Sequence, residues 1–74
     1  MVELIVDFAA GTSEDTARVV ALRAGGTIRR RMRTGEDSVV RLLVQLPDDA
    51  AAQRLSAATE VARTEPNSAD YGTR

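Results

Sequence analysis

The segment 38–46 constrains the fold most, because its side chains separate into two faces with a period of two. Val40, Leu42, Val44 and Leu46 form one apolar face. The opposite face is mixed and carries Val39, Arg41, Leu43 and Gln45. A period of two is typical of a β-strand with one face on a core. We therefore expect a strand at 38–46, in which Val40, Leu42 and Val44 are among the most buried residues.

Three other segments are also expected to be strands. Residues 2–8 alternate in the same way, with Val2, Leu4, Val6 and Phe8 on the core face and Glu3, Ile5 and Asp7 on the other. Residues 27–33 are rich in arginine. Simple alternation there places Ile28 and Met32 on one face, and Arg29, Arg31 and Arg33 on the face away from the helices. Residues 59–65 form a short final strand, which Pro66 stops because proline cannot donate to a ladder.

Two amphipathic helices are expected between these strands. The first begins at Thr12 or Ser13, either of which is a good N-cap. It ends at the two glycines 25 and 26. Its apolar stripe is formed by Ala17, Val20, Ala21 and Ala24. The second opens at Pro47, Asp48 and Asp49, where proline is tolerated and carboxylates meet the positive end of the helix dipole. Its buried stripe is formed by Ala51, Leu55 and Ala58.

This order of elements predicts an α+β fold, the ferredoxin-like β-α-β-β-α-β sandwich. It has a four-stranded antiparallel sheet with two helices on one face. Right-handed crossovers place the first and third strands in the centre. The predicted most buried residues are Val6, Phe8, Val20, Val40, Leu42, Val44 and Leu55. We expect one domain over residues 1–66, and a flexible C-terminal tail over residues 67–74.

The composition argues against an enzyme. Among 74 residues there is no histidine and no cysteine. The missing histidine removes the commonest general base and metal ligand, and the missing cysteine excludes disulfide bonds and thiolate metal sites. We expect no catalytic residue, no cofactor and no metal site. The pairs Glu14/Asp15, Glu36/Asp37 and Asp48/Asp49 are explained by helix starts and turns. No apolar run approaches the ~20 residues that cross a bilayer, so no membrane partner is expected.

All ten basic residues are arginine, and four of them lie within residues 29–33. Such a strand is either solvated and edge-protecting or in contact with a protein. Nucleic acid is not expected as a partner, because base stacking on this face needs aromatic side chains and the chain has only Phe8 and Tyr71. On the face away from the helices, Ile5, Val39 and Leu43 lie among charges. They indicate a partner surface or ordinary exposed aliphatic residues.

Nearly the whole chain resembles the subtilisin propeptide family, also called the inhibitor I9 family. The residues that carry the resemblance are the opening strand 3–8, the glycine stop at 25–26, the junction Leu46-Pro47-Asp48-Asp49 and the ending Val61-Ala62-Arg63-Thr64-Glu65-Pro66-Asn67. In that family the sequence at the junction is often L-P-E-E, and the ending is often V-x-x-V-E-P-D. Thr64 stands where the family usually has an aliphatic residue.

The resemblance implies a function as inhibitor, or as propeptide and folding chaperone, of a subtilisin-like serine protease. The open sheet face, with Ile5, Arg41 and Leu43, would pack on two surface helices of the protease. Glu65, helped by Asn67, would cap those helices. The tail would lie in the active-site cleft as an added strand; its residues are Ser68, Ala69, Asp70, Tyr71, Gly72, Thr73 and Arg74.

A different class of function stays open. The same sheet face could serve a small regulatory module or a homodimer, for which the tail would not be needed. Localisation follows from the choice. The chain shows no signal peptide, so we expect secretion if it is an excised propeptide, and the cytoplasm otherwise.

Overall fold

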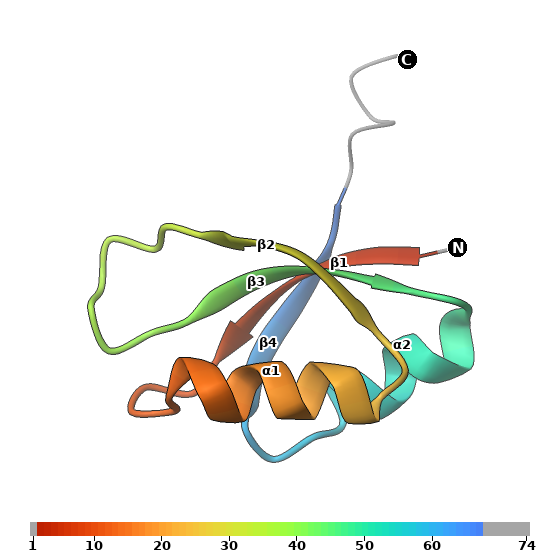
Figure 1. Cartoon of the computed structure of the whole chain (residues 1–74), viewed down its shortest axis with the longest axis horizontal. Coiled ribbons are helices and arrows are strands. Elements are labelled where there is room, and N and C mark those ends of the chain that lie inside the picture. Colours follow the sequence, from red (N-terminus) through yellow and green to blue (C-terminus); the bar gives the residue numbers. More distant parts are fainter. Residues whose placement is uncertain (1, 68–74) are drawn as a thin grey trace.

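The computed structural model describes residues 2–67. The elements are β1 (Val2–Phe8), α1 (Glu14–Arg23), β2 (Thr27–Met32), β3 (Arg41–Leu46), α2 (Asp49–Ser56) and β4 (Val61–Pro66). The four strands form one antiparallel sheet in the order β2-β3-β1-β4. Figure 1 shows both helices on the same, lower side of the sheet. The predicted β-α-β-β-α-β fold, with the first and third strands central, is confirmed.

The core lies between the helices and the apolar faces of β1 and β3. Its fully buried large side chains are Val6, Phe8, Leu42, Val44, Leu46 and Leu55. The buried residues of α1 are Ala17 and Ala21, and its C-cap residue Ala24 is buried as well. The prediction that Val20 is among the most buried residues is wrong, because it is only partly buried at the edge of the core. Small alanine side chains hold the centre of the α1 contact, which leaves Val20 at its flank.

Both helices begin at a side chain that caps them. Ser13, one of the two predicted N-caps, accepts a hydrogen bond at its Oγ from the backbone N–H of Thr16 at 3.1 Å. Asp48 caps α2 by accepting at its Oδ1 from the backbone N–H of Ala51 at 2.9 Å. These bonds satisfy N–H groups that have no partner within the helix.

The two glycines after α1 are required for different reasons. Gly25 has a φ of +93°, a left-handed conformation that favours glycine. Gly26 is needed for space, since a Cβ there would lie 2.5 Å from Val44 Cγ1 and 3.0 Å from the backbone oxygen of Ala21. The chain can therefore turn tightly from α1 into β2 and still lie against the core.

Four strand boundaries differ from the sequence prediction. β2 ends at Met32 rather than at 33, and β4 begins at Val61 rather than at 59. β3 begins at Arg41 rather than at 38, because the preceding residues form a turn in which the Thr34 hydroxyl donates to the backbone oxygen of Glu36 at 2.8 Å. Val40 is still buried, and its carbonyl accepts from the N–H of Phe8 at 2.9 Å. β4 continues through Pro66. This is compatible with proline because β4 is an edge strand.

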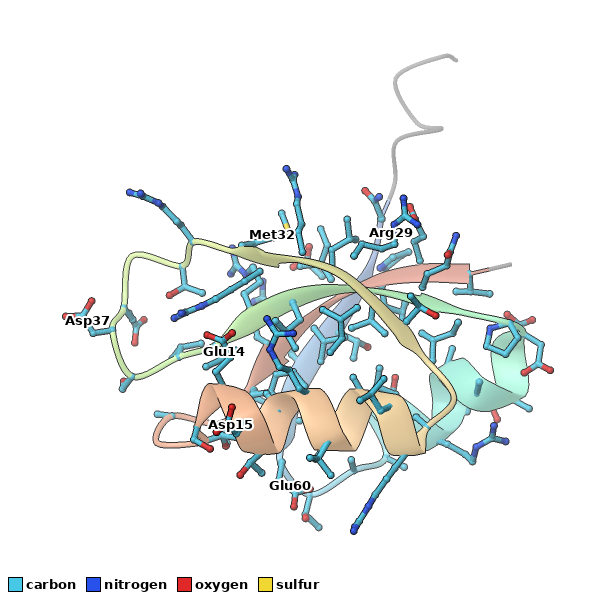
Figure 2. All side chains as sticks on the ribbon, viewed as in Figure 1. Glu14, Asp15, Arg29, Met32, Asp37 and Glu60 are labelled. Atoms are coloured by element: carbon cyan, nitrogen blue, oxygen red, sulfur yellow. The ribbon has the colours of Figure 1, made fainter. Side chains whose placement is uncertain are left out.

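A β-bulge in β2 overturns the predicted faces of the arginine segment. Ile28 is paired with Val44, but Arg30 rather than Arg29 is paired with Leu43. The extra residue reverses the alternation after it. Met32 therefore lies on the face away from the helices. Arg31 lies on the helix side, where its Nη1 is 2.8 Å from Oε1 of Glu14; Figure 2 shows Met32 and Glu14 on opposite sides of the sheet.

Candidate docking surface on the open sheet face

The sheet face opposite the helices is not covered by any element within residues 2–67 (Figure 1). We call it the open face. Its side chains, read from the strand register, are Glu3, Ile5, Asp7, Thr27, Arg30, Met32, Arg41, Leu43, Gln45, Arg63 and Glu65. Ile5 is paired with Leu43 on one side and with Glu65 on the other. The register therefore brings together the expected contact residues from β1, β3 and β4, including Arg41.

A chain of alternating charges crosses the open face from β3 to β4. The Arg41 guanidinium donates to both carboxylate oxygens of Asp7, with 3.1 Å between Nη2 and Oδ2. Arg63 Nε lies 3.7 Å from the same Oδ2. The Nη2 of Arg63 then donates to Oε1 of Glu65. Two positive and two negative side chains from three strands thus neutralise one another.

The Asp7–Arg41 pair is the most protected part of this chain. The Asp7 side chain is 16% exposed and that of Arg41 29%. The hydrogen bond from Arg41 lowers the pKa of Asp7 below its ordinary value. The positive charges of Arg41 and Arg63 act in the same direction, and burial opposes them. The same hydrogen bond raises the pKa of Arg41. Asp7 therefore stays ionised in the folded protein to a lower pH than a free aspartate does.

A shallow hollow of about 100 Å³ lies beside these charges. Its lining residues are Ile5, Asp7, Met32, Arg41, Arg63 and Glu65. Ile5 and Met32 supply the aliphatic carbon and sulfur atoms of its wall. Met32, Asp7 and Arg63 were not among the predicted site residues. Arg63 could have been found from its spacing of two from Glu65 on an alternating strand, whereas Met32 reaches this face only because of the bulge.

The end of β4 is tied to the start of β1. The backbone N–H of Asn67 donates to the carbonyl of Glu3 at 2.8 Å, and its side-chain Nδ2 donates to the Glu3 Oε1 at 2.9 Å. Asn67, the first residue of the expected tail, is thus hydrogen-bonded to the sheet. The remaining expected tail residues, 68–74, lie outside the described residues.

Thr64 lies on the opposite side of β4 from the open face. It is half-buried, and its hydroxyl is 3.2 Å from the Ser56 hydroxyl of α2. A polar residue is accepted there because it has a hydrogen-bond partner. Threonine at this position therefore does not interrupt β4.

The arginines of β2 do not form one continuous cluster. Arg31 pairs with Glu14 on the helix side. Arg30 lies on the open face opposite Leu43, and Arg29 occupies the bulge. Within residues 2–67, neither Arg29, Arg30 nor Arg33 forms an ion pair. The hairpin that follows β2 encloses a second, open hollow of about 550 Å³, lined by the polar turn and by Met32 and Val39.

Among the described residues, no three acidic side chains approach closely enough to hold a metal ion. No helix in this part of the chain is long and apolar enough to cross a bilayer. No family model matches the chain, and no curated protein matches it significantly.

Proposed function

We propose that this protein binds and inhibits a subtilisin-like serine protease, as a separate inhibitor or as the propeptide and folding chaperone of that protease. It acts as a binding partner and not as an enzyme. The observation that carries the proposal is the open face. Ile5 and Leu43 form a paired apolar centre beside a charge chain that neutralises itself, and no described element covers them.

The composition of this face suits burial against a protein. Free charges are costly to remove from water, whereas paired and hydrogen-bonded charges cost less. Asp7 and Arg41 are already paired and partly shielded. A partner can therefore cover the centre of the sheet without having to neutralise these two groups itself.

Glu65 is suited to cap a helix of the partner. Its side chain is 55% exposed. Within the described residues, Oε1 accepts from Arg63 and Oε2 has no hydrogen-bond partner. A carboxylate oxygen of this kind can accept from the N–H groups at a helix N-terminus, which also carry the positive end of the helix dipole. The exposed ion pair with Arg63 is weak enough to rearrange on docking.

The C-terminal residues 68–74 would supply the second half of the mechanism. They follow Asn67, which is fixed to β1 beside the open face. A body docked through that face would hold the following residues at a high local concentration near the protease cleft. There they can pair as an added strand. The fold and the tail should each inhibit poorly alone.

An inhibition assay with subtilisin and a chromogenic peptide substrate tests the proposal. The full chain should inhibit at or below micromolar concentration. Removal of residues 68–74 should leave the thermal unfolding midpoint nearly unchanged, while the inhibition constant rises by orders of magnitude. Glu65→Ala should weaken inhibition by roughly 0.5–2 kcal/mol, the usual contribution of a helix cap. Asp15→Ala, on the exposed start of α1, is the matched control.

A dimerisation module is the second candidate, and one observation favours it. Ile5 and Leu43 face each other on adjacent antiparallel strands, so a twofold axis through this pair would place the same surface on both copies, as an isologous dimer requires. Sedimentation separates the two functions. A stable dimer that persists without residues 68–74, and that inhibits no subtilisin-like protease, would replace the inhibitor proposal.

A further inference from the structure

Met32 is placed on the open face by a structural irregularity rather than by the sequence pattern. The bulge at Arg29 shifts the register of β2, so that Met32 is opposite Arg41 and points away from the helices (Figure 2). There it lines the hollow together with Ile5, beside the Asp7–Arg41 and Arg63–Glu65 pairs. Methionine is flexible and polarisable, so it adapts its shape to a group that enters beside it.

The size and charge of this hollow limit what can fill it. Its volume of about 100 Å³ equals that of roughly three water molecules at about 30 Å³ each, which is the scale of one aliphatic side chain. The charges at its border are already paired with each other. An apolar group that displaces the water therefore leaves every one of these charges paired. A charged group that entered the hollow would find no free opposite charge among them.

Arg30, next to the hollow, places a second requirement on the partner surface. It lies on the same face two residues before Met32, which corresponds to a separation of about 7 Å along the strand. Its side chain is exposed and has no ion pair within residues 2–67. A surface docked here would cover a positive charge that this chain does not neutralise, so the partner must supply a negative one.

We infer that the protein surface bound by the open face inserts one aliphatic side chain into the hollow beside Met32 and sets a carboxylate opposite Arg30. This inference rests on the proposed function and adds the chemistry of the protease surface that is recognised. Met32 and Arg30 then act as specificity-determining contacts on the β2 side, separate from Glu65 on β4.

Inhibition constants against subtilisin test the inference with the full chain. Met32→Glu should raise the constant at least about tenfold, because it replaces an apolar contact with a carboxylate that must lose its water on docking. Met32→Ala should raise it a few-fold, since the contact loses packing atoms. Arg30→Gln should raise it several-fold at low salt, and about 0.5 M salt should remove most of that difference by screening.

Two matched controls lie on α1, on the other side of the molecule. Leu22→Glu introduces the same charge at an apolar residue that is 58% exposed. Arg23→Gln removes an exposed arginine that forms no ion pair in the described part of the chain. Both should change the constant less than about twofold. Thermal melts confirm that each variant is folded.

The outcomes separate this inference from the function on which it rests. If the wild type inhibits and Glu65→Ala weakens inhibition, but Met32→Glu and Arg30→Gln behave like their α1 controls, the inference is wrong and the proposed function stands. If the wild type does not inhibit at micromolar concentration, both are wrong. A loss with Arg30→Gln that is unchanged by salt would overturn the part assigned to the carboxylate.

Discussion

The guanidinium of Arg41 donates to both carboxylate oxygens of Asp7, the residue directly opposite it on the neighbouring strand. The two residues are 34 positions apart in the sequence. A two-point pair of this kind has a defined geometry as well as a favourable energy. It therefore supports the register between β1 and β3, the two central strands that carry Ile5 and Leu43.

Stability should depend on pH through Asp7. Its pKa is lowered from the ordinary value of 3.8 in the folded state. The contribution is therefore fully present above about pH 4 and is lost as the pH falls through the lower folded pKa. Asp7→Asn should reduce the free energy of unfolding at pH 7 and weaken this acid dependence. Urea unfolding at pH 7 and near pH 3 measures both effects, with Asp37→Asn in the exposed turn as the control. Equal acid dependence in the wild type and Asp7→Asn would contradict the assignment.

The space at Gly26 should not accept a methyl group. A Cβ would lie 2.5 Å from Val44 Cγ1, so Gly26→Ala should lower the free energy of unfolding by about 1–3 kcal/mol through overpacking. Gly35→Ala is the comparison, because nothing lies within 4 Å of its Cβ and only the φ of +82° is unfavourable. Denaturant unfolding should show the larger loss for Gly26→Ala. A smaller loss there than at Gly35 would mean that α1 and β3 do not approach so closely.

Leu42 should be among the least replaceable core residues. It is fully buried on β3, so Leu42→Ala should cost about 2–5 kcal/mol through lost burial and the remaining cavity. A domain of this size has a small margin of stability, and this loss can unfold it. Leu22→Ala, at an exposed position, should change stability by less than about 0.5 kcal/mol. Circular dichroism melts compare Leu42→Ala with Leu22→Ala. Similar unfolding midpoints for the two variants would contradict the placement of Leu42 in the core.

The reversed alternation in β2 can be tested through Arg31. Its contact with Glu14 is solvent-exposed, so a double-mutant cycle of Glu14→Gln and Arg31→Gln should give a coupling energy of about 0.2–1 kcal/mol. The matched cycle with Arg30→Gln should give almost none, since Arg30 lies on the other face. Coupling of Glu14 to Arg30 instead of Arg31 would show that β2 has no bulge.

The fold could be predicted because its rules are local. Strict alternation in β1 and β3, the N-cap at Ser13, the helix start at 47–49 and the glycine pair after α1 each determine a segment without knowledge of the rest. The bulge at Arg29 could not be predicted in this way. It depends on how β2 pairs with β3. Because residues 29–31 are all arginine, an inserted residue there does not change the pattern of apolar and polar residues.

The candidate site was predicted in part for the same reason. Ile5, Arg41 and Leu43 follow from alternation in the two central strands, and Glu65 followed from the resemblance of the chain ending. Asp7 and Arg63 acquire their importance from pairing across strands, and Met32 from the bulge. Each of these three depends on tertiary contacts that the sequence order does not contain.

The inhibition constant of Leu43→Asp against subtilisin tests the central claim most directly, because Leu43 lies in the middle of the open face and far from residues 68–74 in the sequence. The wild type should inhibit at or below micromolar concentration. Leu43→Asp should weaken inhibition at least about tenfold, since it replaces the apolar centre of the contact with a carboxylate that must lose its water on docking. Leu22→Asp on α1 should inhibit like the wild type. Equal inhibition by Leu43→Asp and the wild type, or no inhibition by the folded wild type, would contradict the account.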